Sequence, residues 1–117
     1  MEVTLEMRRG AIRIFELAFL GDLQNPAVNF TSGGSRGNRH LGYIRFSYPV
    51  STRYYFRTVC RLKTILSSLG ITSVIIGFLY FEIPDTLESR TKLESFGQLS
   101  EEEFRAIEHF LSLGGVD

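Results

Sequence analysis

The segment from Thr31 to Phe46 holds the residues best suited to chemistry, because it combines glycines and serines with three arginines and a histidine. In Gly33–Gly37 a serine lies among glycines, as a nucleophilic serine on a tight turn does. The guanidinium groups and backbone amides of such a loop are also able to hold an anion. A long hairpin connection uses the same residue types, since glycine accepts positive φ and arginine keeps an exposed tip in water. We favour the hairpin connection.

Further catalytic arrangements find little support in the chain. Asp85 and His109 follow Ser35 in the order of a serine hydrolase, but the segment after the loop is strand-like and no oxyanion-hole loop is recognisable. The glycine patterns of phosphate and dinucleotide loops are missing from the sequence. Cys60, His40 and His109 have no second ligand at helical spacing. We therefore expect no enzyme activity, no metal and no cofactor.

Residues 39–46, "RHLGYIRF", resemble the octamer of the RNA-recognition motif at six of eight positions, and residues 18–23 loosely resemble its partner hexamer. In that family, aromatic side chains on adjacent strands stack on bases. The resemblance implies single-stranded nucleic-acid binding through a sheet face that carries Tyr43. Leu41 stands where the family has another stacking aromatic residue.

Residues 43–97 resemble the later half of a GNAT-type acetyltransferase: a strand, a helix ending "SSLG", the strand "VIIGFLYFEI" and the segment "ESRTKLESFG". That family binds the pyrophosphate of acetyl-CoA with a glycine-rich turn at the start of the helix. The matching stretch, Ser51 to Arg57, contains no glycine. The resemblance implies a degenerate acetyltransferase-like domain in which Arg53 and Arg57 contact phosphate.

Size and composition predict one domain over residues 1–117. A chain of 117 residues with 44% hydrophobic and 22% charged residues is long enough for one compact core. The single cysteine, Cys60, cannot form an internal disulfide, which is typical of a reducing compartment. The longest apolar run, Val74 to Phe81, is far shorter than a membrane span, and the N-terminus lacks the pattern of a signal peptide. We therefore expect a cytoplasmic protein without membrane contact.

Charge is distributed unevenly although the formal net charge is zero. Residues 1–63 hold ten Lys/Arg and four Asp/Glu, whereas residues 64–117 hold three and nine. Such a distribution indicates two halves that pair inside one fold, or a basic binding face beside an acidic tail. We favour the pairing of the two halves, because a compact domain brings them together.

Residue patterns predict an α+β domain with an antiparallel sheet of four to five strands and two to three helices packed mainly on one face. Alternation at Val3, Leu5 and Met7 predicts a hairpin over residues 3–20, although residues 11–20 also fit helical spacing. Strands are expected at residues 27–30, 41–48 and 72–83, the last being central and covered on both faces. Helices are expected at residues 51–70, 85–96 and 100–113, with Ser100 and Glu103 as a capping box.

With no catalytic constellation, the leading hypothesis is a non-enzymatic protein that acts through protein–protein contacts as a regulator, inhibitor or assembly subunit. The candidate residues for binding a partner or an anion are Arg36, Arg39, His40, Tyr43, Arg45, Arg53, Arg57 and Arg61. Nucleic acid is the alternative partner.

A homodimer is expected through the second face of the sheet. Tyr43 with Leu41, or Phe15 with Leu17 and Phe19, would supply the apolar area. The basic helix of one copy would face the acidic C-terminal helix of the other.

Overall fold

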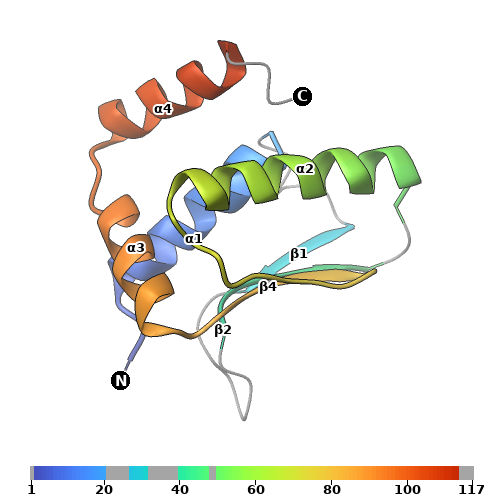
Figure 1. The fold of residues 1–117 in the computed structure, drawn as a ribbon, viewed down its shortest axis with the longest axis horizontal. Coiled ribbons are helices and arrows are strands. Elements are labelled where there is room, and N and C mark those ends of the chain that lie inside the picture. The colour runs from blue at the N-terminus through green and yellow to red at the C-terminus, as the bar shows by residue number, and fades with distance from the viewer. Residues whose placement is uncertain (1, 21–26, 32–39, 48–49, 114–117) are drawn as a thin grey trace.

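The computed structural model describes residues 2–20, 27–31, 40–47 and 50–113, which form a four-stranded antiparallel sheet and four helices (Figure 1). The elements in chain order are α1 (Leu5–Ala18), β1 (Val28–Thr31), β2 (His40–Phe46), α2 (Thr52–Ser68), β3 (Ile75–Ile76), β4 (Tyr80–Pro84), α3 (Leu87–Gly97) and α4 (Glu101–Leu113). The strand order is β1-β2-β4-β3, and each neighbouring pair is antiparallel. The predicted α+β class is confirmed, with one helix more than expected.

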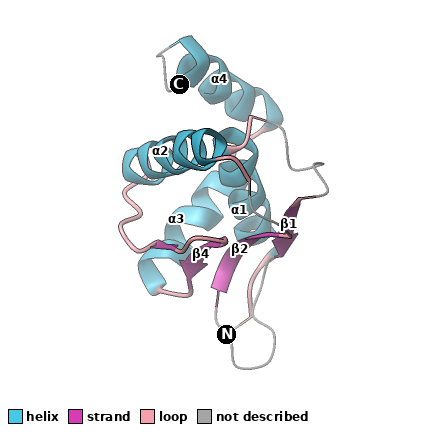
Figure 2. Cartoon of the chain, turned by 90° about the vertical axis from the view of Figure 1, so that its right-hand side faces the viewer, coloured by secondary structure: helices cyan, strands magenta, loops and turns pink. Residues whose placement is uncertain are grey.

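The core lies between the sheet and the helices α1 and α2, which cover one of its faces (Figure 2). Ile44 and Phe46 of β2 and Phe81 and Ile83 of β4 are buried on that face. The rings of Phe46 and Phe81 meet edge to face at 5.4 Å between centroids. Since residues in a strand alternate between the two faces, the other face carries a different set of side chains.

The N-terminal segment forms a helix, so the predicted hairpin over residues 3–20 is wrong. α1 begins after Thr4, whose hydroxyl accepts a hydrogen bond from the Met7 amide at 3.2 Å. Its buried residues recur at helical spacing: Met7, Gly10, Ala11, Arg13, Ile14, Phe15, Leu17 and Ala18. The alternation that suggested a strand ends at Met7, whereas the helical pattern continues through Ala18 and buries far more apolar surface. The helical alternative for residues 11–20 is thus correct as far as Ala18.

A close backbone contact joins α1 to α3. A Cβ atom on Gly10 would lie 2.1 Å from the Leu93 carbonyl oxygen, and one on Gly97 would lie 1.8 Å from the Glu6 carbonyl oxygen. Neither position has room for a side chain, so glycine is needed at both for the two helices to approach this closely. Arg13 fixes the same junction, since its Nη1 donates to the carbonyls of Phe96 at 3.0 Å and Leu99 at 2.8 Å.

Residues 72–83 form a hairpin, so the predicted single strand covered on both faces is wrong. Gly77 separates β3 from β4, and its amide donates to the Tyr80 carbonyl at 2.9 Å. The apolar run therefore turns at its middle, and Phe78 and Leu79 at the turn are exposed. The apolar run thus combines the exposed turn residues Phe78 and Leu79 with the buried residues of β4.

The remaining helices follow their predicted signals closely. Ser51 caps α2, and Gly70 has the positive φ of 77° that ends a helix. Thr86 caps α3, and the Asp85 carboxylate before it holds Arg90 through two hydrogen bonds of 2.6 and 2.8 Å. The capping box of α4 is confirmed, because the Ser100 amide donates to Glu103 and the Glu103 amide donates to the Ser100 hydroxyl.

Part of the charge asymmetry is neutralised inside the chain, as expected of two halves that pair. Arg13 of the basic half lies 3.6 Å from the Glu101 carboxylate of the acidic half. The Arg13 guanidinium also lies over the Phe104 ring, at 4.8 Å from its centroid. These contacts attach the start of α4 to α1.

We predict that Gly10→Ala destabilises the fold by about 1–3 kcal/mol, because the added methyl group forces α1 and α3 apart. Urea unfolding followed by circular dichroism measures the change. Ser95→Ala on the exposed side of α3 is the matched control, with an expected change within about 0.5 kcal/mol. Equal stability of Gly10→Ala and the wild type would contradict the close contact.

The pKa of Glu103 is lowered from its ordinary 4.5, first by the Ser100 backbone amide and then by the Ser100 hydroxyl. A carboxyl group whose pKa is lower in the folded state than in the unfolded state stabilises α4 when the pH is above its ordinary pKa. This contribution is lost as the pH falls through the pKa of the folded state. We predict that an NMR titration gives Glu103 a pKa below 4.5. In Ser100→Ala the pKa should move only part of the way back, since the backbone amide remains. A wild-type value at or above the ordinary one would contradict the capping geometry.

Candidate functional site

The face of the sheet opposite α1 and α2, here called the open face, carries an aromatic and charged group of side chains. Tyr43 and Arg45 of β2 alternate with the buried Ile44 and Phe46, and Tyr80 and Glu82 of β4 alternate with buried residues in the same way. In the strand register Tyr43 lies opposite Glu82, and Arg45 lies opposite Tyr80. The four side chains therefore occupy adjacent positions on one surface.

Aromatic contacts order this group of side chains. The rings of Tyr43 and Tyr80 stack with centroids 5.8 Å apart and an interplanar angle of 23°. A register shift between His40 and Gly42 brings the His40 ring to 5.1 Å from that of Tyr43. The buried Nδ1 of His40 makes no hydrogen bond within the described residues, and its distance of 3.7 Å from the Glu82 carboxylate is too long for one.

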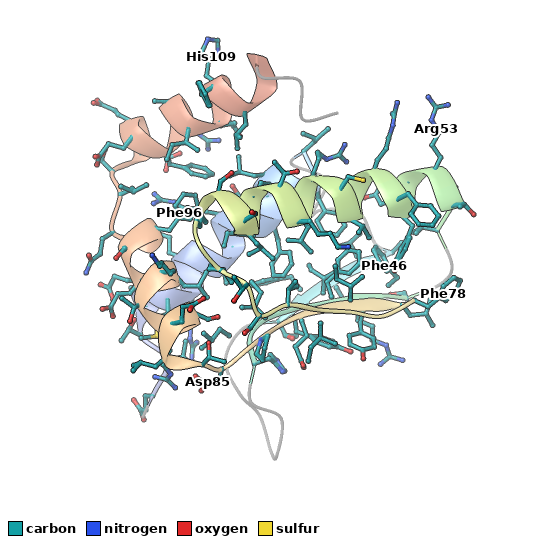
Figure 3. The ribbon with its side chains drawn as sticks, in the orientation of Figure 1. Phe46, Arg53, Phe78, Asp85, Phe96 and His109 are labelled. Carbon is teal, nitrogen blue, oxygen red and sulfur yellow. The ribbon has the colours of Figure 1, made fainter. Side chains whose placement is uncertain are left out.

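The predicted site residues do not form one cluster. His40, Tyr43 and Arg45 come together on the open face. Arg53 and Arg57 are exposed on α2, on the far side of the sheet, and Figure 3 shows Arg53 projecting away from the strands. Arg36 and Arg39, together with the glycine-rich loop, lie outside the described residues.

Arg61 follows Arg53 and Arg57 at helical spacing in α2, but unlike them it is not exposed. Its side chain is buried, and its Nε donates to the Ala18 carbonyl at 2.7 Å. That carbonyl is at the C-terminal end of α1, where a cation is favourable because the last carbonyls of a helix lack partners within the helix. The geometry gives Arg61 a structural contact between α1 and α2.

Most residues expected to form a dimer surface are in the core. Phe15, Leu17 and Phe19 are buried with α1, and Leu41 is buried in β2, so these residues cannot supply the open face as expected. Tyr43 alone of that set is on the open face. Sequence reasoning missed Tyr80 and Glu82, although the alternation in Tyr80-Phe81-Glu82-Ile83 was a usable signal.

A second candidate surface, here called the apolar end, lies where the start of α2 meets the turn between β3 and β4. Val50, Thr52, Tyr55, Phe56, Phe78 and Leu79 line a hollow of about 120 Å³. Phe56 and Phe78 are 58% and 75% exposed at its edge. Tyr55 is held in place, since its hydroxyl donates to the Gly77 carbonyl at 2.9 Å and its ring contacts those of Phe56 and Phe78.

A polar recess of about 540 Å³ lies between α1 and α4, and its charged groups largely satisfy one another. Glu101 at its wall lies 2.8 Å from Arg105 and 3.6 Å from Arg13. The pKa of Arg105 is raised, first by its hydrogen bond to Glu108 and further by the charge of Glu101. We therefore interpret the recess as part of the junction between α1 and α4, and not as a binding site.

Within the described ranges there is no group of three or more His, Cys, Asp or Glu residues able to hold a metal ion. None of the helices described is both long and apolar enough to cross a membrane. No protein-family model, curated protein or solved structure matches this chain.

We predict that Arg61→Ala destabilises the protein by about 1.5–3 kcal/mol, because it leaves the buried Ala18 carbonyl without its charged donor. Arg57→Ala, on the exposed part of the same helix, should change the free energy of unfolding by no more than about 0.5 kcal/mol. Thermal and urea unfolding of both variants measure the difference. Equal effects would contradict the structural assignment of Arg61.

Proposed function

We propose that this protein is a non-enzymatic binding protein that acts through contact with another protein. The apolar end takes an aliphatic or aromatic side chain from an acidic segment of that partner. The observation that carries this proposal is the pair of exposed phenylalanines, Phe56 and Phe78, beside a preformed apolar hollow.

Burial of these side chains gives the surface its binding energy. Removing a large apolar side chain from water contributes about 1.5–3 kcal/mol, and aromatic residues around a small pocket are typical of binding hot spots. The hollow of about 120 Å³ is suited to one side chain and not to a drug-sized ligand, whose pockets are larger. Tyr55 limits the entropy lost on binding, because its hydrogen bond to Gly77 already orders one wall.

Charge indicates the kind of segment that fits. Arg53 and Arg57 are exposed on α2, within one turn of Phe56 along the helix. No acidic side chain lies within ion-pair distance of either arginine among the described contacts. Acidic residues flanking the apolar anchor would be attracted to this helix, which raises the rate of association.

Acetyl-CoA binding has weaker support. The start of α2 offers no glycine, and the Ser51 hydroxyl accepts a hydrogen bond from the Tyr54 amide at 3.1 Å. A pyrophosphate group would have to compete with that cap. Calorimetric titration with acetyl-CoA tests this alternative directly.

Selection from a displayed library of random peptides tests the leading proposal with a defined probe. We predict that the selected peptides contain an aromatic or aliphatic anchor flanked by Asp or Glu. Their affinity should fall by about tenfold or more in Phe56→Ser/Phe78→Ser, since each buried aromatic side chain contributes more than 1.4 kcal/mol. Fluorescence anisotropy measures the affinity, and circular dichroism checks that the variant folds.

Leu87→Ser is the matched control, because Leu87 is 78% exposed at the start of α3, away from the apolar end (Figure 1). It should bind the selected peptides as the wild type does. Arg53→Glu/Arg57→Glu should weaken binding, and more so at low salt. Peptides that bind the wild type and the phenylalanine variant equally would overturn the proposal.

A further inference from the structure

The open face is a second, independent surface, and its charges are arranged to complement themselves. We propose that a second copy of this chain covers it, in a two-fold dimer in which Arg45 of each copy pairs with Glu82 of the other. This inference does not depend on the apolar end, which is formed by α2 and the β3–β4 turn.

The strand register places four side chains at the corners of a rectangular patch. Arg45 lies opposite Tyr80 and Tyr43 lies opposite Glu82, so the two charges occupy one diagonal and the two tyrosines the other. Strands are about 4.8 Å apart, and residues two positions apart on one strand are separated by about 6.8 Å. The patch is therefore small enough for all four side chains to meet a single partner surface.

A two-fold axis that runs along the tyrosine diagonal, between two facing sheets, carries Arg45 of one copy to the Glu82 side of the other. Arg45 of one copy then faces Glu82 of the other, and the same contact occurs a second time by symmetry. Each tyrosine faces its own counterpart across the axis. The strands of the two sheets cross at a steep angle, which is the orthogonal class of sheet packing.

The single chain leaves these groups without such partners. Among the described residues Arg45 has no ion pair, and the Glu82 carboxylate lies 3.7 Å from Nδ1 of the His40 ring. Ile75, which lies opposite Glu82 in β3, is 43% exposed and adds apolar area to the same face. Dimerisation would bury the stacked tyrosines and Ile75 while giving both charges a partner.

Single-stranded nucleic acid is the competing occupant, since Tyr43, Tyr80 and Arg45 are residue types that stack on bases and contact phosphate. Glu82 argues against it, because its carboxylate lies opposite Tyr43 in the register and repels a phosphate backbone. The same carboxylate would attract Arg45 of a second copy. The charge pattern therefore favours the dimer.

Analytical ultracentrifugation of the full chain tests the proposal. Wild-type protein should associate from its 13.3 kDa monomer to a dimer between micromolar and about 200 µM. Arg45→Glu and Glu82→Arg should each weaken self-association by about tenfold or more, because each places like charges across the interface. Lys92→Glu, at an exposed position of α3 beside Gly70, is the matched control and should leave the dimer unchanged.

An experiment that mixes the two single variants decides whether Arg45 and Glu82 meet across the dimer interface. In each single variant, residues 45 and 82 carry the same charge and repel each other across the interface. In a heterodimer of the two variants, both contacts join opposite charges. An equimolar mixture should therefore form a heterodimer with affinity near that of the wild type. Loss of folding does not produce this result, since a misfolded variant is not rescued by its complement. A wild-type monomer at all concentrations, or single variants that fail to associate when mixed, would overturn the dimer.

Titration with a labelled thymidine 20-mer at low salt tests nucleic-acid binding. We expect no binding, and Tyr43→Ala should behave as the wild type toward this probe. Binding by the monomer that is lost in Tyr43→Ala would assign the open face to nucleic acid and overturn the dimer proposal.

Discussion

The contact of α1 with α3 at Gly10 and Gly97 is the constraint on which much of the arrangement depends. Because neither glycine carries a Cβ, the two helix backbones approach until carbonyl oxygens occupy the space of the missing side chains. This fixes α1 against α3. Arg13 then reaches the carbonyls that end α3, and Glu101 at the start of α4. The position of α4 thus follows from a contact at the other end of the chain.

Helices on only one face of the sheet divide the molecule into a covered and an open side. The covered side holds the aromatic core around Phe15, Phe46 and Phe81, while the open side holds Tyr43 and Tyr80 with two opposite charges. The apolar end is separate, because it depends on the start of α2 and on the turn at Gly77. The proposed dimer would use the side chains of the open face, and the proposed partner would use those of the apolar end.

Arginines of this chain serve different purposes that their sequence spacing does not distinguish. Arg13, Arg61 and Arg90 each donate to backbone carbonyls or carboxylates and hold elements together. Arg45, Arg53 and Arg57 remain exposed. Arg13 and Arg61 meet the C-terminal ends of α3 and α1, where uncompensated carbonyls attract cations, and Arg90 meets the Asp85 carboxylate.

Local signals in the sequence determined α2, the capping of α4, the strands β1 and β2 and the α+β class, because periodicity and caps act over a few residues. They also placed His40, Tyr43 and Arg45 among the candidate binding residues. Only the tertiary structure decided that Gly10 lies within a helix, that the apolar run of residues 72–83 turns at Gly77, and that Arg61 is buried. It also decided that Tyr80 and Glu82 lie beside Tyr43. These features depend on which distant segments pack together, and strand pairing and helix packing bring together residues whose separation along the chain carries no local signal.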